Sequence, residues 1–271
     1  MASEVVEKTM YKKTYAMVHN PVARGRHPRY LVNGTMKPKG VTTILGNTLS
    51  KDLMDWAVSA CCNYLRTKLP VVTEEDLVIG ADEYNRLRDA GGSTGSEAHY
   101  LVENFLKGRK PEENATNSVE AVNAYNAFVS WFVEATPEVL AVESVVFSPR
   151  YMFAGKFDAL MKIDGKIYLC DLKTTNPSRK APNGVYAEYF LQMGAYALAY
   201  EEERKFEIEN GGTELPEIDD FMVISAKKNG KIDIVTASSL GLDVESCGEL
   251  FRDVLGIHDF LLNTTKQLGG K

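Results

Sequence analysis

The stretch from Gly155 to Lys173 constrains the fold of this 271-residue chain more than any other. Two apolar runs flank Asp164-Gly165, and an Asp-Gly pair in this setting is a strong signal for a tight β-hairpin. The first run carries Asp158, and the second carries Asp171 and Lys173. We therefore predict two antiparallel strands with charged side chains in their central part.

Asp171 and Lys173 are expected to point to the same side of their strand. Side chains alternate along a strand, so residues two apart share a face, while Cys170 and Leu172 point the other way. Strands this apolar are normally buried, and burying unpartnered carboxylates and an ammonium costs roughly several kcal/mol. Two explanations stay open at this point: a salt bridge near a sheet edge, and a divalent cation held by oxygen ligands.

Composition indicates an ordinary globular chain, with 44% hydrophobic and 25% charged residues. No apolar run approaches the roughly 18 residues of a membrane span, so we expect no membrane partner. The first residues resemble neither a secretory signal nor a transit peptide. Four cysteines without Cys-x-x-Cys spacing favour a reduced, cytoplasmic protein and argue against zinc or an iron–sulfur cluster.

The net charge of −6 is unevenly distributed along the chain. Residues 1–40 hold eight Lys and Arg against two acidic residues, which leaves +6 there and −12 in the rest. A basic arm of this kind can contact phosphates, although a solvated surface without a partner explains the pattern equally well. Tyr11, Tyr15 and Tyr30 interleave with the basic residues and either stack on unpaired bases or pack the arm onto the body.

The remaining chain divides into helix and strand signals. We expect helices over 50–70, within 74–90, and over 91–107, 119–135, 185–203 and 244–262, with a small hairpin within 15–45 and strands at 139–147, 221–225 and 232–236. The element order predicts an α+β or mixed α/β layer architecture that forms one compact domain. Within it, residues 1–90 are interpreted as a basic hairpin with a helical elaboration, and residues 91–271 as the core.

Several polar residues outside the hairpin lie where they suit a site. Gly95 and His99 share one helix face, which places bare backbone beside an imidazole, but a lone helical histidine is also commonly a packing or capping residue. Glu143 stands in an otherwise apolar strand. Gln192 and Tyr196 share a face of a strong helix, either as a half-buried polar stripe or as part of a site.

Together and in this order, the motifs resemble the PD-(D/E)XK nuclease superfamily. They are Gly95-x-x-x-His99, Glu143, Gly155-x-x-Asp158, Asp171-Leu-Lys173-Thr-Thr and Gln192-x-x-x-Tyr196. Within the superfamily they are most similar to the RecB-type branch, which includes helicase-associated nuclease domains, the mitochondrial genome-maintenance exonuclease and many phage exonucleases. The resemblance implies a restriction-endonuclease-like core, a central mixed sheet flanked by helices, with a helical N-terminal elaboration.

The resemblance also implies a site for Mg²⁺ or Mn²⁺. By position, Asp158 and Asp171 would ligate the metal, with the backbone carbonyl of Leu172 as a further ligand. His99 would be the additional ligand typical of this branch, and Glu143 a supporting acid near the metal. Oxygen ligands suit Mg²⁺, and the imidazole softens the site enough that we expect Mn²⁺ to work as well.

Lys173 would orient or activate the attacking water, and Gln192 with Tyr196 would position Lys173 and the DNA backbone. Branch members that hold an iron–sulfur cluster carry a closely spaced cysteine group after the core, which this chain lacks, so we expect no cluster.

The expected function is that of a metal-dependent DNA exonuclease of phage type, acting in recombination, replication or degradation of DNA. Its expected partners are single-stranded or duplex DNA ends and a recombination or single-strand-binding protein, in the host cytoplasm if the gene belongs to a phage. Two alternatives stay open: a structure-specific or flap endonuclease of the same fold, and a catalytically silent DNA-binding protein. The motifs leave open the polarity, the strand preference and the choice between one and two metals.

Overall fold

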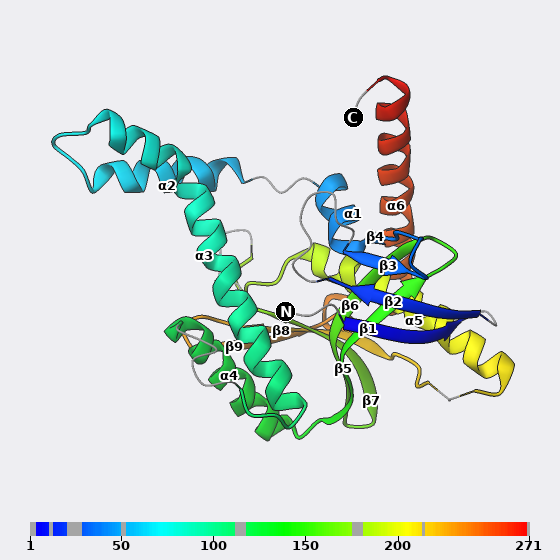
Figure 1. Ribbon diagram of the computed structural model, residues 1–271. Helices are drawn as coiled ribbons and strands as arrows, with labels where there is room; N and C mark the ends of the chain where they lie inside the picture. The colour runs from blue at the N-terminus through cyan, green and yellow to red at the C-terminus, as the bar shows by residue number, and fades with distance from the viewer. Residues whose placement is uncertain are drawn as a thin grey trace.

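The computed structural model describes residues 4–10, 13–20, 29–49, 53–111, 118–174, 181–212 and 215–269; for residues 4–10, 13 and 14 it describes the backbone only. A six-stranded sheet forms its centre, and a three-stranded sheet lies at the N-terminal end (Figure 1). The strands are β1 (Glu4–Met10), β2 (Lys13–His19), β3 (Tyr30–Val32), β4 (Lys39–Gly40), β5 (Glu138–Ser148), β6 (Phe153–Ile163), β7 (Lys166–Lys173), β8 (Asp220–Ala226) and β9 (Ile232–Thr236). The helices are α1 (Val41–Thr48), α2 (Met54–Arg66), α3 (Glu74–Leu106), α4 (Val119–Ala135), α5 (Ala187–Asn210) and α6 (Val244–Gln267), with a 3₁₀ turn at Ser238–Leu240.

The predicted hairpin is present as β6 and β7. Asp164 and Gly165 both have positive φ, 50° and 83°, as a tight hairpin turn with a right-handed strand twist requires. The strand order is β4-β6-β7-β8-β9, with β5 on the other edge of β6. Because β4–β6 and β7–β8 pair in parallel and the others antiparallel, the sheet is mixed, which confirms the predicted fold class.

Helices cover both faces of the central sheet. The larger core cluster joins α1, α5 and α6 to one face, with Phe153, Phe157 and Phe221 among its buried side chains. The second cluster joins α3 and α4 to the other face around Phe128. Figure 1 shows this layered arrangement, with α2 and the first half of α3 projecting away from the body. None of the helices in the described part of the chain is long and apolar enough to cross a membrane.

The small N-terminal sheet packs on β5 and β6. Its buried side chains Tyr15, Met17, Tyr30 and Val32 form a third cluster with Val145, Phe147 and Ala154. Tyr15 and Tyr30 are each 6% exposed, so the structure favours packing over base stacking for these two residues. The side chain of Tyr11 and several basic side chains of the arm lie outside the described residues.

Some helix predictions are wrong in their bounds. The two helices expected within 74–90 and over 91–107 are one helix, α3, because a capping box at Thr73 fixes its start and the burial of Ala98 and Val102 anchors its second half. These contacts outweigh the roughly 1 kcal/mol that each internal glycine costs a helix. The proposed boundary after residue 90 falls inside α3. Moreover, β4 and α1, from the N-terminal part, belong to the main sheet and core.

Two further differences have local causes. Val41 to Leu45, which reads as β-prone, is helical because Val41, Ile44 and Leu45 repeat at helical spacing and bury one face in the core. Helix α5 extends to Asn210 and ends at Gly211 in the left-handed conformation, seven residues beyond the end of the helix expected over 185–203.

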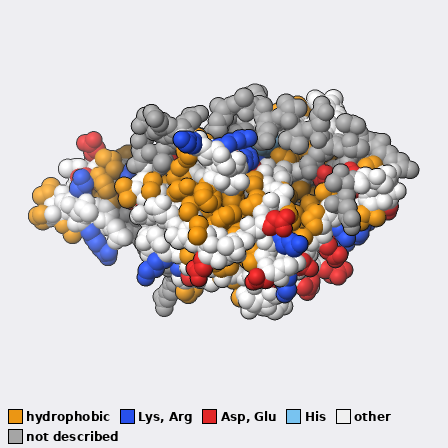
Figure 2. Space-filling view, turned by 90° about the horizontal axis from the view of Figure 1, so that it is seen from below, with side chains coloured by type: hydrophobic (Ala, Val, Ile, Leu, Met, Phe, Trp, Pro, Cys, Tyr) orange, Lys and Arg blue, Asp and Glu red, His pale blue; other side chains and the backbone are white. Residues whose placement is uncertain are grey.

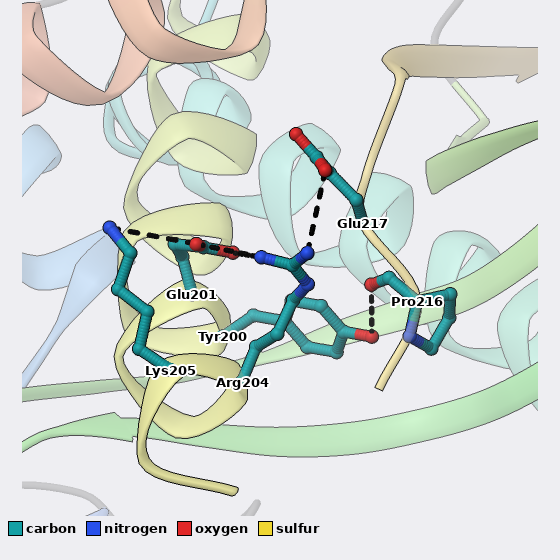
Figure 3. Close-up of polar contacts among 6 residues, drawn as sticks. All are labelled: Tyr200, Glu201, Arg204, Lys205, Pro216 and Glu217. Carbon is teal, nitrogen blue, oxygen red and sulfur yellow. Dashed lines mark hydrogen bonds and ion pairs between the residues drawn. The ribbon is translucent and has the colours of Figure 1, made fainter. Parts of the chain in front are cut away.

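Polar contacts fasten the C-terminal half of α5 to the segment that enters β8 (Figure 3). Tyr200 donates a hydrogen bond to the carbonyl of Pro216 at 2.9 Å. Arg204 contacts Glu201 at 3.0 Å and Glu217 at 3.4 Å. These contacts hold the start of β8, which is the parallel neighbour of β7 and so helps to place the charged residues of β7.

We expect His19 to make the protein less stable in acid. His19 is 6% exposed and stacks on Tyr30, and burial, assisted by the charges of Lys156 and Arg29, lowers its pKa to about 4. In the unfolded chain His19 takes up a proton near its ordinary pKa of 6.5. The contribution of His19 to the free energy of unfolding is therefore fully present above pH 6.5 and decreases as the pH falls toward 4. The loss is at most about 3 kcal/mol, from about 1.4 kcal/mol per unit. Urea unfolding between pH 8 and 4.5 should show a shallower acid-side decline for His19→Gln than for the wild type; equal declines would contradict this assignment.

Candidate active site

The candidate site lies where β6 and β7 separate. Their pairing ends at Ala159 and Cys170, after which β7 continues beside β8. At the other end of β6, β4 pairs only with Phe153 and Ala154. Within the described part of the chain, residues 155–158 of β6 therefore have no strand partner on this edge. The Leu172 amide donates a hydrogen bond to Asp158 Oδ2 at 2.7 Å across the opening. Asp158 therefore lies between the two strands.

Three residues from different elements lie together at this opening and form a candidate set of metal ligands: His99 from α3, Glu143 from β5 and Asp158 from β6. His99 Nδ1 is 3.5 Å from Asp158 Oδ1, and one donor atom from each of the three lies within 4.8 Å of the others. Opposite ligands of an octahedral Mg²⁺ are about 4.2 Å apart, given metal–oxygen distances of about 2.1 Å. Two carboxylates and an imidazole at this separation fit a divalent cation after small shifts. We call these three residues the metal trio.

Glu143 reaches the trio from an irregular stretch of β5. Its φ is 52°, in the left-handed region that residues with a side chain rarely adopt. The register of β5 against β6 also shifts between Val139 and Ala141. Irregularities of this kind redirect side chains beside functional sites. The Glu143 carboxylate also forms an ion pair with Lys156.

Asp171 and Lys173 lie on the α5 side of β7, as the alternation of side chains predicts. Cys170 and Leu172 pack in the opposite cluster, with α3 and α4. Lys173 Nζ is 2.5 Å from Asp171 Oδ2 and 4.7 Å from the centre of the Tyr189 ring. Asp171 is only 2% exposed. Asp171 is not one of the trio, so its role as a metal ligand, like that of the Leu172 carbonyl, stays a prediction.

Gln192 and Tyr196 form a pair on α5, above the strand opening. Gln192 Nε2 donates a hydrogen bond to Tyr196 Oη at 2.7 Å. The Tyr196 ring lies against Gly155, where an added Cβ would be 2.2 Å from Tyr196 Cε1. The glycine of the Gly155-x-x-Asp158 motif is therefore needed for α5 to approach β6 this closely.

Gly95, one turn before His99, has a similar role on α3. A Cβ at Gly95 would lie 3.2 Å from Thr174 Oγ1, just beyond the end of β7. The close approach expected from the sequence is thus made by a side chain that directly follows Lys173.

Burial and charge separate the pKa values of the two aspartates. For Asp158, burial raises the pKa, but His99, Lys173 and the Leu172 amide outweigh it, so the net pKa is lowered. For Asp171, burial raises the pKa by more than Lys173 lowers it. Neighbouring carboxyl groups whose pKa values are pushed apart are typical of sites that move protons.

The metal trio places two carboxylates beside one imidazole in a half-buried setting, so the carboxylates repel each other. Burial and then the charge of Asp158 raise the pKa of Glu143, against the opposing effect of Lys156. Burial lowers the pKa of His99, but the neighbouring Asp158 more than compensates, so the net pKa is raised. A divalent cation would relieve this repulsion between carboxylates.

Sequence reasoning assigned no role to two residues of this site. Tyr189 lies three and seven residues before Gln192 and Tyr196, so helical spacing puts it on the same face, but its contact with Lys173 depends on how α5 crosses the sheet. Lys156 lies within the first strand of the predicted hairpin. Its position two residues before Asp158 was a signal that it shares a strand face with a predicted ligand.

A mixed sheet whose opening collects carboxylates, an imidazole and a lysine is typical of metal-assisted hydrolases. The family model of the PD-(D/E)XK nuclease superfamily matches residues 99–239, just over half of the chain, which includes every predicted site residue. The chain belongs to this superfamily and is a nuclease.

Two other comparisons add little to this assignment. No curated protein sequence matches the chain. Among solved structures, an alkaline exonuclease from Laribacter hongkongensis is similar at 10% identity, with 85% of this chain and 94% of that chain covered. The TM-score of 0.28 is too low for a correspondence between residues.

Proposed function

We propose that this nuclease is a DNA exonuclease that depends on Mg²⁺ or Mn²⁺. The observation that carries the proposal is the meeting of His99, Glu143 and Asp158 beside the buried Asp171–Lys173 pair. Phosphodiester hydrolysis needs a nucleophile derived from water and a way to neutralise charge on the phosphate oxygens. This arrangement offers groups suited to both tasks.

Each residue would have a defined role. The metal trio would hold the cation, joined by the Asp171 carboxylate and the Leu172 carbonyl. Bound there, a divalent ion supplies Lewis acidity and lowers the pKa of a coordinated water. Lys173, held by Asp171 and by the ring of Tyr189, would orient the attacking water and stabilise the negative charge that develops on the phosphate.

The broader role follows from the resemblance to the RecB-type branch. We place the enzyme in recombination, replication or degradation of DNA, as a phage-type exonuclease that acts at DNA ends. A recombination or single-strand-binding protein is the proposed partner, and the cysteine pattern supports a location in the cytoplasm.

Digestion of labelled DNA tests the proposal. The purified protein is incubated with end-labelled linear and with circular DNA, single- and double-stranded, in Mg²⁺, in Mn²⁺ and in EDTA. We expect linear DNA to be degraded from its ends only when a metal is present, while circular DNA stays intact. Cleavage of circular DNA would establish the endonuclease alternative. Binding without cleavage in both metals would establish a catalytically silent DNA-binding protein.

A further inference from the structure

Lys156 lies beside the metal trio but belongs to none of the motifs. It is on β6 two residues before Asp158, and it pairs in register with Val145, two residues after Glu143. Lys156 Nζ forms an ion pair with Glu143 Oε2. The side chains are 26% exposed for Lys156 and 9% for Glu143, so the pair is largely shielded from solvent.

The pair provides a counter-charge for Glu143 when no metal is bound. A carboxylate buried to this extent is costly without a partner, and removing one member of a buried ion pair is strongly destabilising. An oxygen of the same carboxylate lies within 4.8 Å of a ligand atom of His99 and of Asp158, close enough for all three to bind one cation. The ammonium of Lys156 and a divalent cation would therefore share the oxygens of Glu143.

We propose that Lys156 is a positioning residue that holds the Glu143 carboxylate at the metal trio and weakens metal binding there. This inference rests on the proposed metal site and extends it. While the site lacks a cation, the ion pair with Lys156 keeps the Glu143 carboxylate directed toward His99 and Asp158. When a cation binds, it competes with the ammonium of Lys156 for the oxygens of Glu143, which sets the affinity below that of an unpaired Glu143 carboxylate.

The variant Lys156→Met tests this role by metal titration of the full-length protein. Isothermal titration with Mn²⁺ should show binding about tenfold tighter than in the wild type, because the cation no longer competes with an ammonium for the Glu143 oxygens. In EDTA, the melting temperature of the variant should be several degrees lower, because Glu143 has lost its partner. Mn²⁺ should then raise the melting temperature of the variant by more than it raises that of the wild type.

Three further variants separate charge from packing. Lys156→Arg keeps the positive charge and should bind Mn²⁺ with the affinity of the wild type. Lys162→Met makes the same change at an exposed position of β6 and should leave both measurements unchanged. In Glu143→Gln, a second change of Lys156→Met should no longer tighten binding. This double variant loses both charges together, so it is expected to fold even if Lys156→Met alone does not.

The outcomes distinguish this inference from the proposed function. If wild-type protein binds Mn²⁺ and Lys156→Met binds it with equal or lower affinity, Lys156 does not oppose the metal and the inference is overturned. Tighter binding by Lys156→Met in the Glu143→Gln background would also overturn it, because the effect would not pass through Glu143. If the wild type binds neither Mn²⁺ nor Mg²⁺, the metal site itself fails, and this inference fails with it.

Discussion

Replacing Lys173 with Ala, or Asp171 with Asn, is expected to reduce DNA cleavage by on the order of 10²–10⁴-fold while leaving the fold intact. Lys173 Nζ lies 2.5 Å from Asp171 Oδ2, so each side chain holds the other in place. Lys173→Ala removes the charge proposed to orient the water. Asp171→Asn keeps the shape of a side chain that is 2% exposed but removes its negative charge.

Rates of cleavage measured with excess DNA, together with circular dichroism and thermal melting, check this expectation. Lys162→Ala, at an exposed position near the turn of the same hairpin, is the matched control and should cleave like the wild type. Wild-type rates in either Lys173→Ala or Asp171→Asn would refute the proposed roles. Loss of the folded state in both, seen by circular dichroism at the assay temperature, would instead show that the pair is structural.

The second large effect is expected for Gly155→Ala. The added Cβ would lie 2.2 Å from Cε1 of Tyr196, a ring that is 3% exposed and hydrogen-bonded to Gln192. Overpacking of this kind costs about 1–3 kcal/mol of stability. Because α5 must move away from β6 to make room, we also expect cleavage to fall, through loss of the contact between Tyr189 and Lys173.

Urea unfolding and cleavage assays measure both consequences. Gly256→Ala in α6 is the matched control, because nothing lies within 4 Å of its Cβ position, and it should be neutral or stabilising by up to about 1 kcal/mol. Tyr196→Leu, a smaller side chain, should recover part of the stability of Gly155→Ala. If the double variant loses as much stability as Gly155→Ala and Tyr196→Leu lose separately when added together, the clash with Tyr196 is not the cause.

The hairpin was predictable because its signals are local. The Asp164-Gly165 turn fixes the register, and the register places Asp171 and Lys173 on one face and Cys170 on the other. The mixed sheet flanked by helices followed from the element order and the resemblance, and the fold confirms it. The long helix α3 was missed because Gly91 and Gly92 read as a break, whereas packing of the following turns overrides their low helix propensity.

The contacts inside the site depend on tertiary structure that local patterns do not carry. The left-handed backbone of Glu143 leaves no signature in its apolar strand. The contact of Lys173 with Tyr189 depends on the angle at which α5 crosses the sheet. The ion pair between Lys156 and Glu143 depends on the register of β5, which an irregularity near residue 140 shifts.

Figure 2 shows one face, seen from below, on which Lys and Arg side chains, Asp and Glu side chains and hydrophobic side chains all occur. Among the described residues, this face mixes both signs of charge and lacks the uniform positive charge expected where a protein follows the phosphate backbone. Several basic side chains of residues 1–40, for which a phosphate-contacting arm and a solvated surface both stay open, lie outside the described residues.

The most direct test of the proposed metal-dependent nuclease uses wild-type protein stripped of metal by chelation. Linear DNA is mixed with this protein, first without metal and then after addition of Mg²⁺ or Mn²⁺. The proposal predicts no cleavage before the addition and rapid cleavage after it, with tight Mn²⁺ binding that is lost in Asp158→Asn. Cleavage at an equal rate in the presence of chelator, or no cleavage in either metal by protein that still binds DNA, would contradict it.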